Sequence, residues 1–93
     1  MKIIEAYIKE EKNNNLLRKL GFIPAVIYKK NFKNILIKIK ENNLYFIINS
    51  KIELFNNNFI IKIYENNLLE VYIKKIQYHP FKNKIIHIDF IKK

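Results

Sequence analysis

The chain has 93 residues, 49% of them hydrophobic, and a formal net charge of +10 at pH 7; at this size we expect a single domain spanning residues 1–93, with a modest core and no deep cavity. The absence of cysteine excludes a disulfide framework and a thiolate metal site, and no apolar run approaches the ~18 residues that a transmembrane helix needs. Isoleucine, phenylalanine and tyrosine favour strands, so we predict a mainly β protein. We also expect it to be soluble and cytoplasmic and to need no cofactor.

The first part of the chain predicts a strand followed by a short helix. Residues 2–9 alternate between apolar and polar side chains, and Lys9 ends the outward face. The asparagines at 13–15 can cap a helix over residues 16–20, because an asparagine side-chain oxygen accepts from the free N–H groups of a first turn. Gly21 suits the end of that helix. The inward residues of the predicted strand are Ile4, Ala6 and Ile8.

Two further strands and an ambiguous segment follow. Pro24 begins the second predicted strand, which runs over residues 25–28, and residues 35–39 form the third with their lysines outward. Residues 41–48 begin with a polar stretch that could open a second helix. Their β-branched content keeps a strand open as the alternative there.

The second half of the chain predicts short strands separated by asparagine-rich turns. Residues 52–55 form a short strand and residues 56–58 a loop, whereas residues 59–64 and 68–76 form a hairpin around the asparagines that precede Leu68. Six or seven short strands with two small helices favour a small barrel, because a closed sheet has no exposed edge.

The last strand carries the most distinctive polar residues. Ile86, Ile88 and Phe90 alternate and predict a buried face. His87 and Asp89 then lie about 7 Å apart on the other face, close enough to bind one ligand or each other. Asp89 is the only aspartate in a strongly basic chain, so its position calls for a reason. By the same alternation Ile85 belongs to the outward face.

Several readings of this pair are open. His87 and Asp89 could form an acid/base pair, but Ser50 is the only serine, and threonine and cysteine are absent. Among enzymes, the hypothesis that fits best is a ribonuclease that uses His79 and His87 as acid and base. The pair could also be a half-buried imidazole and its hydrogen-bonding partner with no further role. No spacing predicts a metal site.

An RNA-binding reading unites more of the chain. The cationic excess favours a polyanionic partner, although the lysine-rich, asparagine-rich composition also reflects a general compositional bias. A carboxylate is repelled by phosphate, so Asp89 suits an RNA surface only where donors face it, such as a guanine amino group or a 2′-hydroxyl. A generic single-strand binder with an open barrel is the second RNA hypothesis. Residues that can share one surface in a closed barrel are Lys9, Arg18, Lys19, Tyr28, His87 and Asp89.

Two sequence blocks carry a family resemblance. The block at residues 21–28 reads G-x-I-P-A-V-I-Y, and residues 77–80 and 87–90 read Q-x-H-P and H-x-D-F. Together, in this order and about fifty residues apart, they make the chain resemble the bacterial large-subunit ribosomal L25 family. The resemblance covers nearly the whole chain and is weakest between residues 29 and 58.

The resemblance implies a six-stranded β-barrel with two or three short helices that binds 5S rRNA in the minor groove of its loop E and helix IV region, in the central protuberance of the large ribosomal subunit. It also implies neighbouring ribosomal proteins as partners, no enzymatic activity, no small-molecule substrate, and a monomer away from the ribosome. Lys29 and the asparagines at 13–15 depart from the family pattern, which has glycine or serine there. The RNA contacts that the resemblance assigns are Lys9, Arg18, Lys19, Tyr28, His87 and Asp89, with Gln77 matching the motif.

Overall fold

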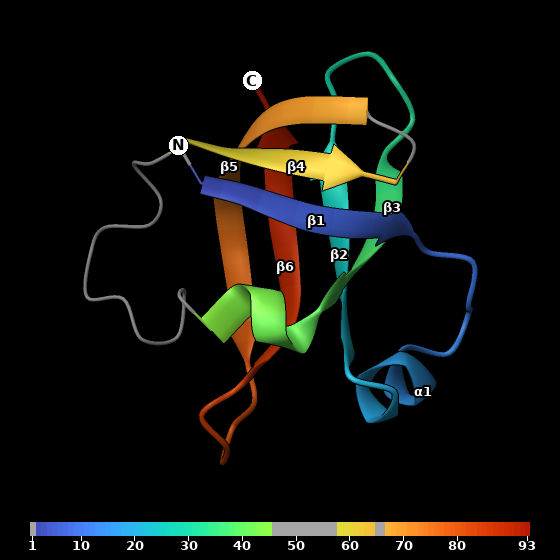
Figure 1. The fold of residues 1–93 in the computed structure, drawn as a ribbon, viewed down its shortest axis with the longest axis vertical. Helices are drawn as coiled ribbons and strands as arrows, with labels where there is room; N and C mark the ends of the chain where they lie inside the picture. The colour runs from blue at the N-terminus through green and yellow to red at the C-terminus, as the bar shows by residue number, and fades with distance from the viewer. Residues whose placement is uncertain (1, 46–57, 65–66) are drawn as a thin grey trace.

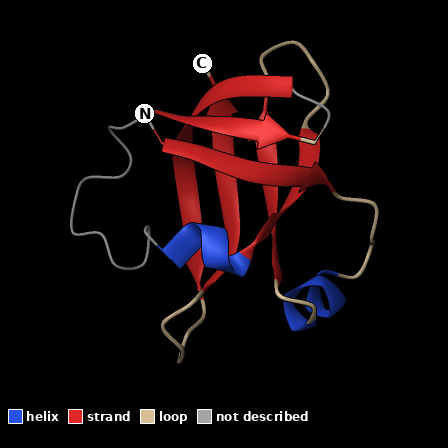
Figure 2. Cartoon of the chain, viewed as in Figure 1, coloured by secondary structure: helices blue, strands red, loops and turns tan. Residues whose placement is uncertain are grey.

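The computed structural model describes residues 2–45, 58–64 and 67–93. Six strands close into a barrel in the order β1-β3-β2-β6-β5-β4, with little helix around it (Figures 1 and 2). This confirms the predicted mainly β barrel. The elements are β1 (Lys2–Ile8), α1 (Asn14–Lys19), β2 (Phe22–Tyr28), β3 (Ile35–Lys40), the 3-10 helix η1 (Glu41–Leu44), β4 (Asn58–Ile63), β5 (Asn67–Tyr78) and β6 (Ile85–Lys92).

The barrel combines antiparallel and parallel pairing. Strand β1 pairs antiparallel with β3 and parallel with β4, while β6 pairs parallel with β2 and antiparallel with β5. In this order β1 and β6 are three strands apart in either direction, so they lie on opposite walls. Figure 1 shows β1 crossing in front of β2, β5 and β6.

The core consists of the inward side chains of all six strands. Phe90 is the largest fully buried side chain, and no polar or charged residue is buried among the described ranges. The alternation predicted for the third strand is confirmed, because Ile37 and Ile39 are buried while Lys38 and Lys40 are not. Burying these side chains removes about 25 cal/mol of unfavourable hydration per Å2 of apolar surface, which makes the core the main source of stability.

The predicted helix and both of its end signals are confirmed, with an earlier start. The side chain of Asn13 accepts hydrogen bonds from the N–H groups of Asn15 (3.0 Å) and Leu16 (3.2 Å), so the helix begins at Asn14. Leu17 is its buried residue. Gly21 ends the segment at φ +86°, a conformation that side chains with a Cβ rarely adopt.

Two details of the strands differ from the sequence prediction. Ile8 was predicted to face the core and is 50% exposed, because the pairing of β1 with β4 ends at Ala6. Strand β2 starts at Phe22 and contains Pro24, whose missing N–H is tolerated because pairing with β6 starts only at the next residue.

The remaining differences concern turns and the ambiguous segment. Asn58 was predicted to lie in a loop and Asn67 in a turn, but each begins a strand; residues 56–57 and 65–66 lie outside the described residues. Of the predicted segment 41–48, the described part starts as a 3-10 helix. The strand predicted at 52–55 lies outside the described residues.

Candidate nucleic-acid interface

Strands β5 and β6 are irregular at two places, and both irregularities shape the outer surface. Tyr78 pairs with Ile85 and Gln77 with His87, so Ile86 is an extra residue on β6. This bulge reverses the predicted faces: Ile85 is buried and Ile86 is partly exposed, so the predicted sides of both were wrong. Beyond the bulge the predicted alternation holds, because Ile88 and Phe90 are buried.

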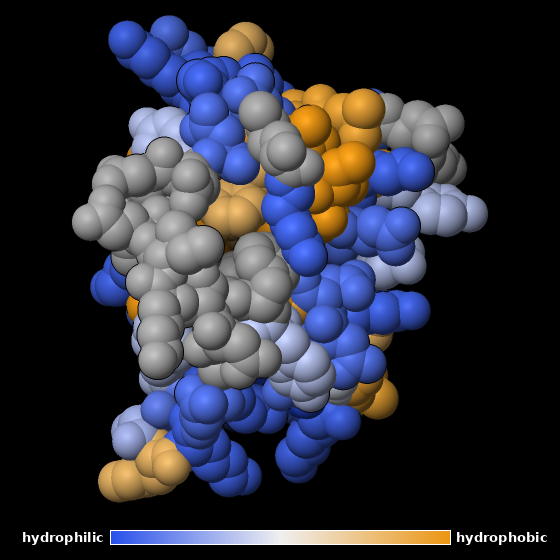
Figure 3. All heavy atoms as spheres, turned by 60° about the vertical axis from the view of Figure 1, so that its left-hand side comes forward, coloured by the Kyte–Doolittle hydropathy of each residue, from blue (hydrophilic) through white to orange (hydrophobic). Residues whose placement is uncertain are grey.

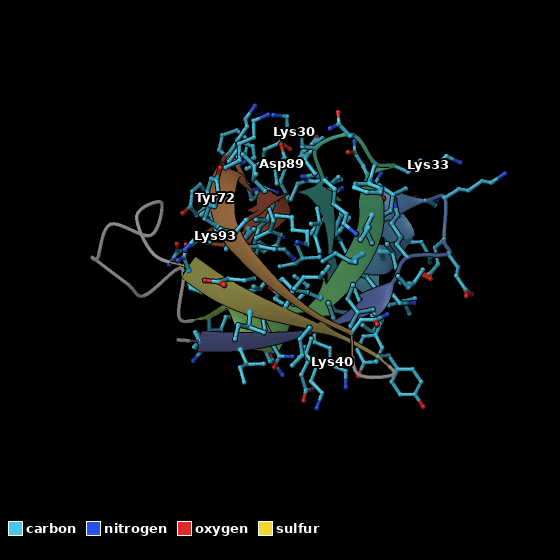
Figure 4. The ribbon with its side chains drawn as sticks, turned by 90° about the horizontal axis from the view of Figure 1, so that it is seen from above. Lys30, Lys33, Lys40, Tyr72, Asp89 and Lys93 are labelled. Atoms are coloured by element: carbon cyan, nitrogen blue, oxygen red, sulfur yellow. The ribbon has the colours of Figure 1, made fainter. Side chains whose placement is uncertain are left out.

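The His87–Asp89 pair lies on the outer surface of β6. Its side chains retain 22% and 19% exposure, and His87 Nδ1 lies 3.2 Å from Asp89 Oδ1. The two residues therefore bind each other, as one of the predicted possibilities required. Figure 4 looks down on the barrel and shows Asp89 on the side away from Lys40.

The surroundings of His87 favour the neutral imidazole. Partial burial lowers the pKa of His87, the carboxylate of Asp89 raises it, and the cations Arg18, Lys9 and Lys75 lower it, so the net shift is downward from the usual 6.5. In a neutral imidazole one ring nitrogen donates and the other accepts. Nδ1 faces the Asp89 carboxylate, which leaves Nε2 for another partner.

Arg18 is fixed at the edge of this pair by the β6 bulge. Its Nε donates to the carbonyl of Ile86 at 3.0 Å, and its terminal nitrogen donates to the Asn15 side chain at 3.1 Å. The extra residue frees a carbonyl that a regular ladder would occupy. This hydrogen bond attaches helix α1 to the start of β6 and keeps the Arg18 charge close to His87.

The second bulge adds two lysines. Ile73 pairs with Phe90 and Lys75 with Asp89, so Lys74 is an extra residue on β5. Lys75 thus faces Asp89 across the strands, and Lys74 Nζ lies 4.9 Å from the ring centroid of Tyr28. Neither lysine was predicted from the sequence to be a contact residue. Their signal was the Lys74-Lys75 doublet, which interrupts the alternation of a strand.

The structure gathers six of the seven predicted contact residues. Gln77 pairs directly with His87, and Val26 pairs with Asp89, which puts Tyr28 two residues farther along the same outer side of β2. Lys19 follows Arg18 on α1 and is exposed, but no contact ties it to the others. We call the following set the basic face: Lys9, Arg18, Tyr28, Lys74, Lys75, Gln77, His87 and Asp89.

His79 has a separate, structural environment in the β5–β6 loop. Its Nδ1 accepts hydrogen bonds from the N–H groups of Phe81 and Lys82, both at 3.1 Å. One of its nitrogens is thus occupied by the loop backbone. Within the described ranges, no group of three or more histidine, cysteine, aspartate or glutamate residues could hold a metal ion. The part of the chain described here also contains no helix of the length and apolarity that crossing a membrane requires.

Comparisons with known proteins agree with this architecture. Residues 4–90 match the model of the Ribosomal L25p family. The "Large ribosomal subunit protein bL25" of Blochmanniella floridana is 39% identical over 98% of this chain and 92% of that protein. The protein of the same name from Buchnera aphidicola is 32% identical over 98% of this chain and 97% of that protein.

Other relatives are longer. The bL25 protein of Nitrosomonas europaea is 32% identical over 83% of this chain, but the match spans only 38% of that protein. The chain thus corresponds to nearly the full length of some relatives and to less than half of others. On the family match and these identities, the chain belongs to the Ribosomal L25p family.

Proposed function

We propose that this chain binds 5S rRNA through the basic face, in the irregular minor groove of the loop E and helix IV region. Family membership makes it a structural, non-enzymatic constituent of the large ribosomal subunit in the cytoplasm, which excludes the ribonuclease alternative. The observation that carries the proposal is a partly exposed, outward-facing His87–Asp89 pair surrounded by Arg18, Lys9 and Lys75, each from a different segment.

The cations account for affinity in this proposal. Lysine and arginine side chains neutralise phosphates and release condensed counterions, a gain that does not depend on base sequence. Lys9 and Lys75 lie on either side of the His87–Asp89 pair, on the β1–α1 connection and on β5. They suit two phosphate strands that flank a groove.

His87 and Asp89 account for selectivity. We assign the imidazole proton to Nδ1, which faces Asp89 Oδ1 at 3.2 Å, so that Nε2 is an acceptor and the carboxylate offers its second oxygen. The wide minor groove of A-form RNA displays 2′-hydroxyls and guanine amino groups, which are donors. An acceptor pair inside a ring of cations fits such a groove better than it fits bare phosphates.

The remaining parts of the proposal concern geometry and assembly. The face belongs to a closed barrel, so its spacing is set before RNA binds, which reduces the ordering cost of binding. Tyr28 adds a ring that can pack on a ribose, and Gln77 adds an amide beside His87. We further propose that residues 1–93 act as one domain, monomeric away from the ribosome, that docks as a rigid body.

A gel-shift comparison tests the proposal. It compares a folded 5S rRNA fragment with an unstructured RNA of equal length. His87→Ala or Asp89→Ala should weaken binding to the folded RNA by roughly 5- to 150-fold, the value of one groove contact, and should leave binding to the unstructured RNA unchanged. Lys62→Ala, which removes an exposed cation from β4, is the matched control. Equal losses on both RNAs would defeat the role assigned to the pair.

A further inference from the structure

Two loops extend the basic face at its opposite ends. Residues 29–34 follow β2, and residues 79–84 precede β6. Because β2 and β6 are parallel neighbours, the end of one strand and the start of the other lie at opposite ends of the face. Figure 1 shows these loops at the top and the bottom of the barrel.

Each loop carries a phenylalanine that the fold leaves in solvent. Phe81 is 92% exposed and Phe32 is 73% exposed, the two highest values among the large hydrophobic side chains described. In Figure 3, hydrophobic atoms project among hydrophilic ones at the upper and lower ends of the molecule. Exposed aromatic rings contribute nothing to the core, so their place at both ends of one face suggests a partner.

The backbone around each ring is held in place. In the 79–84 loop, His79 Nδ1 accepts the N–H groups of Phe81 and Lys82, and the His79 N–H donates to the Lys84 carbonyl at 2.8 Å. In the other loop, the Phe32 N–H donates to the Lys29 carbonyl at 3.3 Å. The backbone that carries each ring is therefore held by hydrogen bonds before RNA binds, so less affinity is lost to ordering the loop.

The charges beside the rings point to RNA instead of protein. The 29–34 loop contains three lysines and the 79–84 loop contains two, and neither contains an acid. Lys29 Nζ lies 5.6 Å from the ring centroid of Phe32. An apolar protein pocket would have to desolvate these ammonium groups, whereas a stacked base brings its own phosphates to them.

We propose that Phe32 and Phe81 are aromatic wedges that stack on unpaired or terminal bases at the two ends of the RNA segment bound by the basic face. This inference rests on the proposed RNA-binding function and adds two contacts to it. The strands read the groove between the wedges, and the wedges fix where along the RNA the face sits. The position of the protein along the RNA would then depend on the unstacked bases that an irregular RNA offers.

The absence of tryptophan makes the test site-specific, since a single introduced indole reports alone. Phe32→Trp and Phe81→Trp should each lose emission intensity when the 5S rRNA fragment is added, because a stacked base quenches indole. Ile3→Trp is the control: Ile3 is 56% exposed on β1, on the wall opposite β6. Its emission should stay unchanged.

Affinity provides the second readout. Phe32→Ala and Phe81→Ala should each weaken binding of the 5S rRNA fragment by roughly 5- to 100-fold, as loss of one stacked base does, while the tryptophan variants bind like wild type. Thermal unfolding of both alanine variants should match wild type, because both side chains lie outside the core.

The outcomes separate this inference from the function it rests on. If wild type prefers the folded RNA and His87→Ala abolishes that preference, but the alanine variants bind like wild type and the indoles are not quenched, the wedges alone are overturned. An effect at only one loop overturns the two-ended arrangement. If wild type does not prefer the folded RNA, the proposed function and the wedges fail together.

Discussion

At the scale of single residues, the surroundings of His87 favour its neutral form, although its partner Asp89 acts in the opposite direction. An isolated histidine changes its charge near neutral pH. Here burial and the neighbouring cations lower the pKa, while Asp89 opposes that shift and holds the ring by its Nδ1 atom. In the proposed RNA complex, a contact made by Nε2 as an acceptor would use the neutral form of the ring, which the lowered pKa favours.

NMR titration of the imidazole checks this arrangement. The His87 pKa should lie below 6.5, the usual value, and Asp89→Asn should lower it further, because the carboxylate charge that raises it is removed. Lys75→Gln should move it back up, since a repelling cation is lost. A His87→Gln spectrum assigns the resonance. A pKa above 6.5 would contradict a neutral ring.

Stability should depend on pH in the corresponding window. The folded state lowers the pKa of His87, so the unfolded chain takes up this proton first as pH falls below about 6.5. The contribution of His87 to the free energy of unfolding should therefore be constant above pH 6.5 and decrease as the pH falls below 6.5. His87→Gln should remove that part of the slope, measured by urea unfolding at pH 7 and 5.5. An identical decline in both proteins would exclude a contribution from His87.

At the scale of elements, the two bulges of the β5–β6 pair decide which side chains reach the surface. Strict alternation predicts Ile86 inward and cannot place Lys74 and Lys75 together. The bulge at Ile86 supplies the carbonyl for Arg18. The bulge at Lys74 puts Lys75 opposite Asp89 in the strand pairing and the Lys74 ammonium over the Tyr28 ring. Irregular pairing thus builds the basic face.

Salt dependence tests the lysines of these elements. Lys75→Ala and Lys9→Ala should each weaken binding to all RNAs to a similar degree and flatten the slope of log affinity against log salt by about one unit, the value of one phosphate contact. Lys62→Ala on β4 should leave the slope unchanged. A loss confined to the folded RNA would instead assign Lys75 to base recognition.

The cap of helix α1 gives a test of stability. Asn13→Ala removes the acceptor for two N–H groups and should cost about 1 kcal/mol in the free energy of unfolding. Because Arg18 belongs to the same helix, affinity for the folded RNA should fall as well. Asn13→Asp should retain stability, since aspartate caps equally well. Urea unfolding of wild type, Asn13→Ala and Asn13→Asp measures these differences in stability.

Elements with local signals could be predicted from the sequence, and features set by pairing could not. The asparagine cap, the stop at Gly21 and the alternation of β3 all depend on residues close in the chain. By contrast, Ile8 is exposed because the pairing of β1 with β4 ends before it. Ile86 turns outward because it is the extra residue of a bulge in the β5–β6 pairing. Of the expected contacts, only Lys19 is not tied to the basic face.

At the scale of the whole molecule, closure of the barrel makes a small core sufficient. The six strands leave no unpaired edge, and parallel pairs join strands that are distant in sequence. A domain of this size has a total stability of only about 5–15 kcal/mol. One large core side chain is therefore a substantial fraction of it.

Phe90→Ala should cost about 3–5 kcal/mol in the free energy of unfolding, because the side chain is fully buried and its removal leaves a cavity. Phe32→Ala is the matched control, since the same truncation occurs at a side chain that is 73% exposed. Thermal melts of the two variants should separate widely. Similar melting temperatures would mean that Phe90 is not a core residue in solution.

The position of β6 in the barrel has a consequence for how a local fault would spread. This strand joins β2 to β5, supplies the imidazole and its carboxylate, and provides the carbonyl that holds Arg18. A shift of one residue in its pairing would turn His87 and Asp89 toward the core and displace the attachment of α1 at the same time.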